Sequence, residues 1–554
     1  MKKIILGLSL VVCHLSFSYA QPGWVKKASK SVFTLKTFGD DGSLIASSNG
    51  FFVGQQGEAL SSFTPFIGAA RAIIIDASGK EMPVTGMMGA NEMYDVAKFR
   101  VAGKTQPLAV AASTASVGTT AWLLPYRETK TLPSGIVRKA EKFQADYAYY
   151  TIAMQTPEQA VSCPLLNDAG EVIGLIQPSA AANDSLSYAV SARFADSLKI
   201  TGLSLSSPTL RMTKIKTELP DDLHEANLMV FMAGSTADSL TYINLLSDFI
   251  QKFPSAPDGY TYRAQFAAAH NDFAIAERDM EQAIKLSDQK DEAHFNYARL
   301  IYNKEIFQSQ QSYANWTLDK ALTEIREAIQ TNPLPTYRQV EGNVLFAQGK
   351  YDEAYPVFIE LTKSNLDEAE MWFAAARCKE MLKDTTAMLA LMDSTVSTFS
   401  KPYLKQAAPY LWARANARLD AGKFRDAISD MNDYEQLMST DVNARFYYIR
   451  HQAEIEGRLY QQALNDISRA IQMEPKETLY YAEKASLEVR VGMYDEAIET
   501  AKECIAIDPN LSDGYLFLGL AQCVKGNTKE GVPNLQKAKD LGDPQAETLI
   551  QKYK

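Results

Sequence analysis

The chain has 554 residues and a formal net charge of −10, with 46% hydrophobic and 22% charged residues. This length exceeds what one hydrophobic core serves, so we expect two to four domains, and the balanced composition excludes long disordered segments. The net negative charge comes from residues 201–554, which have 38 Lys and Arg against 51 Asp and Glu, whereas residues 21–200 have 16 against 15. Because affinity for phosphates comes mainly from Lys and Arg, this distribution argues against a nucleic-acid partner.

The N-terminus has the pattern of a bacterial export signal. A positive start at Met1 to Lys3 precedes an apolar run over Ile4–Val12, and small residues follow at Ser18–Ala20. The apolar run is too short to span a bilayer, and small residues before Gln21 are typical of a cleavage site. We therefore predict a signal peptide at residues 1–20 and a soluble mature chain that is periplasmic or secreted.

Residues 21–203 are predicted to form β structure. Short runs rich in β-branched and aromatic residues alternate with Gly, Pro, Asn and Asp turn signals, and Ile73–Val84 has the pattern of a hairpin. The runs are Ser31–Phe38, Ala72–Asp76, Ala121–Tyr126 and Tyr147–Met154. Many short strands with few helical stretches predict an all-β barrel or sandwich.

Four phrases in this region resemble the protease core of the HtrA-like family of trypsin-fold enzymes. They are Ser48–Val53 (SNGFFV), Tyr94–Val101 (YDVAKFRV), Pro164–Gly174 (PLLNDAGEVIG) and Ser187–Ser191 (SYAVS). Their order and spacing match the family across residues 31–200. The resemblance implies a trypsin-like double barrel, which in an active member is a serine peptidase.

The residues that would carry the peptidase chemistry are replaced. In such a site a Ser gives its proton to a His that an Asp orients. Asp95 occupies the Asp position, Thr64 or Phe63 stands where the His is expected, and Val161 replaces the nucleophile. We predict that these degenerate triad positions, Thr64, Asp95 and Val161, have no catalytic role.

Histidine content leads to the same prediction without an alignment. The chain has five His, and none lies between residues 21 and 223. Ser162 and Cys163, next to the nucleophile position, therefore lack a local imidazole base. Their residual reactivity stays open, as does a Ser–Lys arrangement. The spacing of the cysteines fits neither a zinc site nor a disulfide framework, so we expect buried thiols, no metal and no cofactor.

Residues 204–222 lack periodicity and are predicted to be a linker, and residues 223–554 have a helical pattern throughout. Three turn-and-helix phrases, Gly457–Ala463, Gly492–Ala497 and Gly526–Gly531, end on small residues that are 34 positions apart. A 34-residue period with small residues where helices cross resembles the tetratricopeptide repeat (TPR) family. We predict an all-α TPR solenoid of about nine helix pairs, closed by a C-terminal capping helix.

The resemblance also implies where a partner binds. In a TPR unit the fifth and ninth positions of the first helix face the groove, and aromatic, Arg and amide groups suit peptide binding. The alternative is that several of these residues pack against neighbouring units. The predicted groove residues are Phe295, Arg299, Asn343, Phe373, Arg377, Trp412, Asn416, Tyr448 and Gln452.

Three functions remain open from the sequence. The first is an exported bacterial scaffold with a catalytically dead trypsin-like domain, whose array holds protein or peptide partners in the cell envelope. The second is an active trypsin-fold serine peptidase whose array recruits substrates. The third is a β domain that binds peptides without cutting them.

Overall fold

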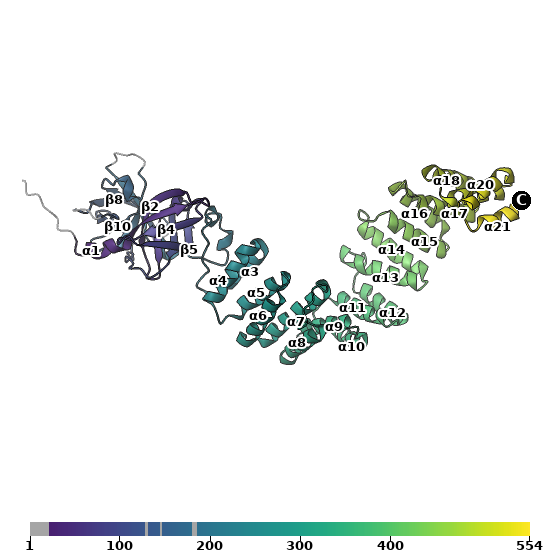
Figure 1. Ribbon diagram of the computed structural model, residues 1–554, viewed down its shortest axis with the longest axis horizontal. Coiled ribbons are helices and arrows are strands. Elements are labelled where there is room, and N and C mark those ends of the chain that lie inside the picture. Colours follow the sequence, from purple (N-terminus) through teal and green to yellow (C-terminus); the bar gives the residue numbers. More distant parts are fainter. Residues whose placement is uncertain (1–21, 128–130, 144–146, 180–184) are drawn as a thin grey trace, which may run out of the picture. The chain divides into compact units, whose positions relative to one another are not determined.

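The computed structural model describes residues 22–127, 131–143, 147–179 and 185–554, so the predicted signal peptide at residues 1–20 lies outside the described residues. The chain divides into two compact units, Met1–Leu286 and Ser287–Lys554. The first holds the β region and four long helices, and the second is helical (Figure 1). Among the described residues, no helix is long and apolar enough to cross a membrane.

The first barrel closes in the strand order β1-β2-β3-β6-β5-β4, with every neighbouring pair antiparallel. Alternate residues of its strands point inward, and Phe33, Leu35 and Phe99 are fully buried in its core. The predicted hairpin is present, with Ile74 opposite Met82. The strands are β1 (Val32–Phe38), β2 (Leu44–Phe52), β3 (Glu58–Ser61), β4 (Arg71–Ile75), β5 (Glu81–Asn91) and β6 (Val96–Val101).

The second barrel closes in the order β10-β11-β12-β9-β8-β7. Its own core includes Tyr150 and Leu165, while a second cluster joins the barrels by packing Phe51 of β2 with Val190 of β12. Two closed antiparallel barrels of six strands confirm the predicted double-barrel fold. The strands are β7 (Thr120–Leu123), β8 (Ser134–Phe143), β9 (Tyr147–Ala153), β10 (Pro164–Leu166), β11 (Val172–Gln177) and β12 (Ser187–Ser191), and short helices α1 (Val25–Ala28) and α2 (Phe194–Ser197) flank the β region.

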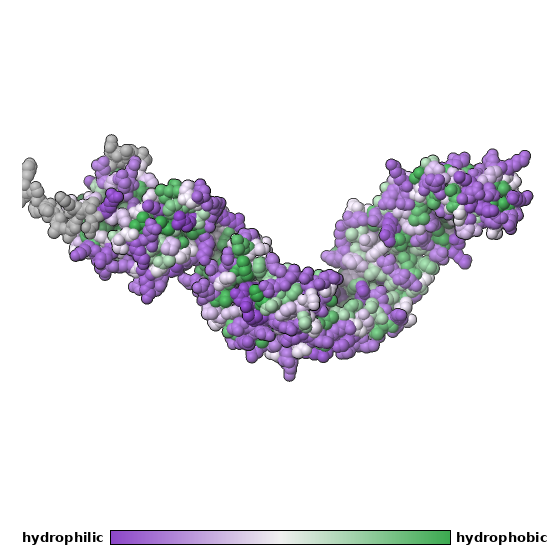
Figure 2. Space-filling view, in the orientation of Figure 1, coloured by the Kyte–Doolittle hydropathy of each residue, from purple (hydrophilic) through white to green (hydrophobic). Residues whose placement is uncertain are grey.

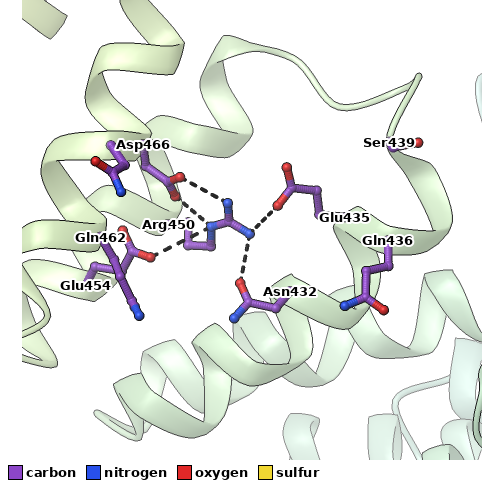
Figure 3. Close-up of a pocket in the computed structure, with 9 residues that line it drawn as sticks. Asn432, Glu435, Gln436, Ser439, Arg450, Glu454, Gln462 and Asp466 are labelled. Carbon is purple, nitrogen blue, oxygen red and sulfur yellow. Dashed lines mark hydrogen bonds and ion pairs between the residues drawn. The ribbon is translucent and has the colours of Figure 1, made fainter.

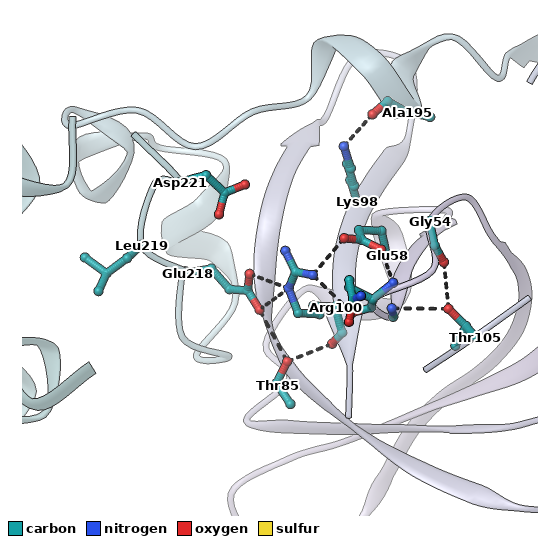
Figure 4. Close-up of polar contacts among 12 residues, drawn as sticks. Gly54, Glu58, Thr85, Lys98, Arg100, Thr105, Ala195, Glu218, Leu219 and Asp221 are labelled. Atoms are coloured by element: carbon teal, nitrogen blue, oxygen red, sulfur yellow. Dashed lines mark hydrogen bonds and ion pairs between the residues drawn. The ribbon is translucent and has the colours of Figure 1, made fainter. Parts of the chain in front are cut away.

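Residues 204–222 differ from the predicted linker because they pack against the first barrel. Ile215 is buried in the barrel core, and Thr217 forms a parallel bridge with Met87 of β5. Glu218 accepts two hydrogen bonds from Arg100 of β6, at 2.8 and 3.1 Å from Nε, as Figure 4 shows. The sequence shows no periodicity here because these contacts are all with residues far away in the chain.

The same segment also holds the first helices. The Lys252 ammonium donates to the Leu219 carbonyl at 2.8 Å and pairs with Asp221 at 2.6 Å. These contacts join α4 to the segment, and the compact unit ends at Leu286 and not at the predicted boundary near residue 222. The helices of this unit are α3 (Leu223–Thr236), α4 (Ser239–Lys252), α5 (Pro257–Ala269) and α6 (Phe273–Leu286).

The second unit consists of seven helix pairs and a final helix, which brings residues 223–554 to the predicted nine pairs. Small residues lie where the paired helices cross. Ala463 and Ala497 are fully buried, and a Cβ on Gly531 would come within 2.4 Å of the Cys523 sulfur. Because larger side chains would separate the helices, the 34-residue recurrence of small residues is a packing requirement.

The helices of this unit are α7 (Lys290–Phe307), α8 (Leu318–Thr331), α9 (Pro335–Ala347), α10 (Tyr351–Leu361), α11 (Glu368–Met381), α12 (Thr385–Ser397), α13 (Ala408–Asp420), α14 (Phe424–Met438), α15 (Ala444–Glu456), α16 (Tyr460–Met473), α17 (Thr478–Arg490), α18 (Tyr494–Ile507), α19 (Ser512–Val524), α20 (Thr528–Asp540) and α21 (Ala546–Tyr553). The last of them, α21, lies at the C-terminal end, where the capping helix is predicted.

Candidate functional site

The structure brings two of the degenerate triad positions into contact. The backbone N–H and the hydroxyl of Thr64 both donate to Oδ1 of Asp95, at 2.6 and 2.9 Å. Asp95 therefore orients a threonine, which has no basic nitrogen to accept a proton from a nucleophile. Asp95 thus still holds the side chain at the position of the triad His, but that side chain is not a base.

Ser162, beside Val161 at the nucleophile position, is held in the interior. Its hydroxyl is fully buried and lies 2.7 Å from the Ser62 hydroxyl and 3.0 Å from the Ser48 hydroxyl. The amide of Asn49 donates to the Val161 carbonyl at 3.0 Å, which ties the loop to β2. A hydroxyl in this network has neither access to substrate nor an imidazole to activate it.

The neighbouring thiol is also held in its protonated form. Cys163 is fully buried. Burial raises its pKa to about 12, because a thiolate would lose its hydration in the barrel core. The other cysteines of the described residues, Cys378, Cys504 and Cys523, are buried free thiols, as the sequence predicts. Among the described residues, no group of three or more His, Cys, Asp or Glu is arranged to hold a metal ion.

The predicted groove residues lie at repeating positions on α7, α9, α11, α13 and α15, and we call them the first-helix row. Their exposure differs by position. Arg299, Arg377 and Gln452, at the ninth position, are exposed, and Asn343 and Asn416 are half-buried. The ninth positions thus present two guanidinium groups and three amides at or near the surface, a set that can bind backbone and carboxylate groups.

The aromatic residues of the row are half-buried because each packs on the next pair of helices. The contact follows one rule, in which the ring at the fifth position of a first helix meets the ring at the third position of the next first helix. Rings so engaged are joints between units, as in the alternative interpretation, and not open anchors. The centroid separations are 4.7 Å for Phe295–Tyr337, 5.4 Å for Phe373–Tyr410, 5.8 Å for Trp412–Phe446 and 5.4 Å for Tyr448–Tyr480.

Several polar groups of the row are also engaged with neighbours. Gln452 donates to the Tyr448 hydroxyl at 2.8 Å, and that hydroxyl donates to Glu483 at 3.3 Å. Arg377 pairs with Glu380 one turn along its helix at 2.8 Å. These exposed pairs contribute little to stability, so a partner can replace them at small cost.

Sequence reasoning missed a set of internal ion pairs. In three repeats an Arg of the first helix forms a two-point contact with an Asp that lies 16 residues later on the second helix. The recurrence of Arg and Asp at this spacing is readable in the sequence and could have identified them. The pairs are Arg263–Asp279, Arg414–Asp430 and Arg450–Asp466, with closest N–O distances of 2.6 Å.

Hydrophilic residues cover most of the face shown in Figure 2, with hydrophobic residues scattered among them. A family model described as a tetratricopeptide repeat matches residues 340–396, which include most of α9, all of α10 and α11, and most of α12. The helices form a TPR array. The guanidinium and amide groups of the first-helix row are suited to polar contacts along such an array.

The TPR array also relates this chain to curated proteins. It is 28% identical to small glutamine-rich tetratricopeptide repeat-containing protein 2 of Saccharomyces cerevisiae, over 22% of this chain and 36% of that protein. The chain is 25% identical to a DnaJ homolog subfamily C member 7 homolog of Dictyostelium discoideum, over 57% of this chain and 52% of that protein. The chain is 22% identical to the Hsp70-Hsp90 organizing protein of Triticum aestivum, over 38% of this chain and 36% of that protein. The chain thus spans about a third to a half of these relatives.

Proposed function

We propose that this protein is an exported bacterial scaffold whose TPR array binds protein or peptide partners in the cell envelope, while its trypsin-like double barrel is catalytically dead. The observation that carries the proposal is the burial of the Ser162 hydroxyl against Ser62 and Ser48, with no base beside it. A site that lacks both the nucleophile and the base of a triad loses roughly 10⁶ in turnover.

The comparisons support the binding role. One relative carries the name Hsp70-Hsp90 organizing protein, which describes a protein that organizes two others. The first-helix row supplies exposed groups for a similar role here, since Arg299, Arg377 and Gln452 are accessible. The envelope location rests on the export pattern of residues 1–20.

A fluorophosphonate probe tests the inactive barrel. The mature chain should remain unlabelled under conditions that label an equal amount of trypsin completely. The Ser162→Ala variant should behave as the parent does. Strong labelling of the parent that disappears in Ser162→Ala would establish the alternative, a serine peptidase whose array recruits substrates.

Affinity capture from bacterial cell envelopes, followed by mass spectrometry, tests the scaffold. The bait is the mature chain, and the row variant carries Arg299→Glu and Arg377→Glu. The matched control carries Lys363→Glu and Lys529→Glu, two exposed sites in the same unit with the same change of charge. Proteins that the parent and control retain and the row variant loses are the expected partners. Equal capture by all three baits would refute the assignment of the row.

A further inference from the structure

A pocket of about 430 Å³, which we call the Lys98 pocket, opens beside the first barrel within the first compact unit. One wall comes from β5 and β6, and the others come from residues 198–201, from the packed segment at residues 218–222 and from the start of α3. Pockets of this size with apolar walls and a few polar groups take small molecules or single residues of a partner. The apolar side chains of its walls are Met88, Leu198, Ile200, Leu219 and Pro220.

Lys98 of β6 places its ammonium group at this pocket. The side chain is half-buried, and among the described residues its only hydrogen bond goes to the Ala195 carbonyl, as Figure 4 shows. Asp196 and Glu58 act on the ammonium from a longer distance, and in the described part of the chain neither forms an ion pair with it. Burial lowers the pKa of Lys98, because its lost hydration is not replaced by a carboxylate. The ammonium therefore has donors left for a ligand.

Two carboxylates of the pocket are paired with other cations of the chain. Glu218 accepts from the guanidinium of Arg100, at 2.8 Å. Asp221 pairs with the ammonium of Lys252, at 2.6 Å. Because both charges are balanced within the chain, neither carboxylate is the missing partner of Lys98.

The other two carboxylates of the pocket bind backbone groups near the start of α3. Asp222 accepts from the N–H of Glu225 at 3.0 Å, and Glu225 accepts from the N–H of Gly202 at 2.6 Å. Carboxylates at the N-terminal end of a helix are stabilised by its dipole. Lys199, which also lines the pocket, forms no ion pair with any described residue. The groups that remain for a ligand are therefore the ammonium groups of Lys98 and Lys199.

The polar pocket between α14, α15 and α16, of about 530 Å³, shows the opposite case (Figure 3). The guanidinium of Arg450 donates there to three side chains, those of Asn432, Glu435 and Asp466. The buried carboxyl of Glu454 forms a hydrogen bond with Asp466 and lies 3.9 Å from Arg450. The charged groups of this second pocket are satisfied within the chain, so none of them is left for a ligand.

We infer that the Lys98 pocket binds an organic carboxylate with an apolar body. The carboxylate accepts from the Lys98 ammonium and is also attracted by Lys199. The apolar body contacts Met88, Leu198 and Ile200. The ligand is either the C-terminal residue of a bound protein or a free acid. The site goes beyond the proposed scaffold function and does not depend on it.

Isothermal titration calorimetry on the mature chain at pH 7 tests the inference with three probes that share one isobutyl group. Acetyl-leucine represents the C-terminal residue of a protein, 4-methylpentanoate represents a free acid, and acetyl-leucine amide is the neutral analogue. At least one of the two acids should bind, and the amide should bind about tenfold more weakly or not at all. Tighter binding of acetyl-leucine assigns the site to a protein C-terminus, and tighter binding of 4-methylpentanoate assigns it to a free acid.

Three variants locate the site. Lys98→Gln removes the ammonium and should weaken the acid about tenfold or more. Lys36→Gln is the matched control, because Lys36 is a half-buried lysine of the same barrel that does not line the pocket, and it should bind as the parent does. Thr201→Trp fills the pocket from an exposed position and should block binding without a change in the melting temperature. This variant keeps the test decisive if Lys98→Gln folds poorly.

Hydrogen-exchange mass spectrometry gives a second measurement of binding at this place. Because Leu219 and Pro220 line the pocket, the acid binds only while residues 218–222 are packed. At an acid concentration of about 100 times its Kd, the amides of residues 214–222 should exchange about 100-fold more slowly, and the acid should have no such effect in Thr201→Trp.

Four results would overturn the inference. They are failure of both acids to bind, equal binding of the amide, unchanged affinity in Lys98→Gln or Thr201→Trp, and unchanged exchange of residues 214–222 at saturating acid.

Discussion

Replacing Glu454 with glutamine should make the α15–α16 helix pair more stable near neutral pH, with little effect in acid. In the folded chain this carboxyl has a pKa of about 8, against an ordinary value of 4.5. At a pH between these two pKa values, the Glu454 carboxyl is protonated in the folded state and ionised in the unfolded state. The free energy of opening therefore falls by about 1.4 kcal/mol for each pH unit, and by roughly 3 kcal/mol from pH 5 to pH 7. Glutamine has no proton to lose, so the variant avoids this fall.

Hydrogen-exchange mass spectrometry measures the opening of individual helices. The quantity measured is the exchange rate of the α15 and α16 amides in the parent divided by their rate in Glu454→Gln. This ratio should be about 100-fold larger at pH 7 than at pH 5. Glu456→Gln, on the exposed side of the same helix, is the control and should leave the ratio unchanged. A ratio for Glu454→Gln that is the same at pH 5 and pH 7 would refute the assignment of a buried, protonated carboxyl.

Three further outcomes follow from contacts described above. Glu218→Ala removes one of the two carboxylates that pair with Arg100, leaving Glu58, and should destabilise the packing of residues 204–222 by about 1–3 kcal/mol. Limited proteolysis should then cleave this segment faster, whereas unchanged cleavage would contradict the packing. Ala463→Leu overfills a fully buried helix crossing and should cost about 1–3 kcal/mol, read as lost amide protection confined to its helix pair. Cys163, with a pKa raised to about 12, should resist iodoacetamide at pH 8 in the folded chain and react in denaturant; modification without denaturant would count against its burial.

The repeats were predictable because their determinants are local. A Gly-containing turn and a small residue at the helix crossing recur every 34 residues, so residues such as Ala463 and Ala497 identify the unit wherever it occurs. The packing of residues 204–222 was not predictable. It depends on the burial of Ile215 in the barrel core and on the ion pair of Glu218 with Arg100. The two residues of this ion pair are 118 positions apart in the chain.

The candidate sites were predictable only where short sequence phrases specify them. Alignment with the protease phrases placed Thr64 near Asp95, and the structure has them in contact. The confinement of Ser162 by Ser62, 100 residues away, leaves no pattern in a single sequence. The position of an aromatic residue in a repeat likewise does not reveal whether its ring is open or packed, because that depends on the residue at the third position of the following unit. The ring of Phe295 is packed because Tyr337 occupies that third position.

The ring contacts between consecutive first helices also have a mechanical consequence for the array of the second unit. Each contact, such as Tyr448 on Tyr480, joins one repeat only to the next. Because repeats in a solenoid touch only their neighbours, such contacts act as elastic joints in series. A ligand that separates one ring pair alters the angle of one joint and leaves the stiffness of the others unchanged. A change at one ring contact is therefore confined to one pair of neighbouring repeats.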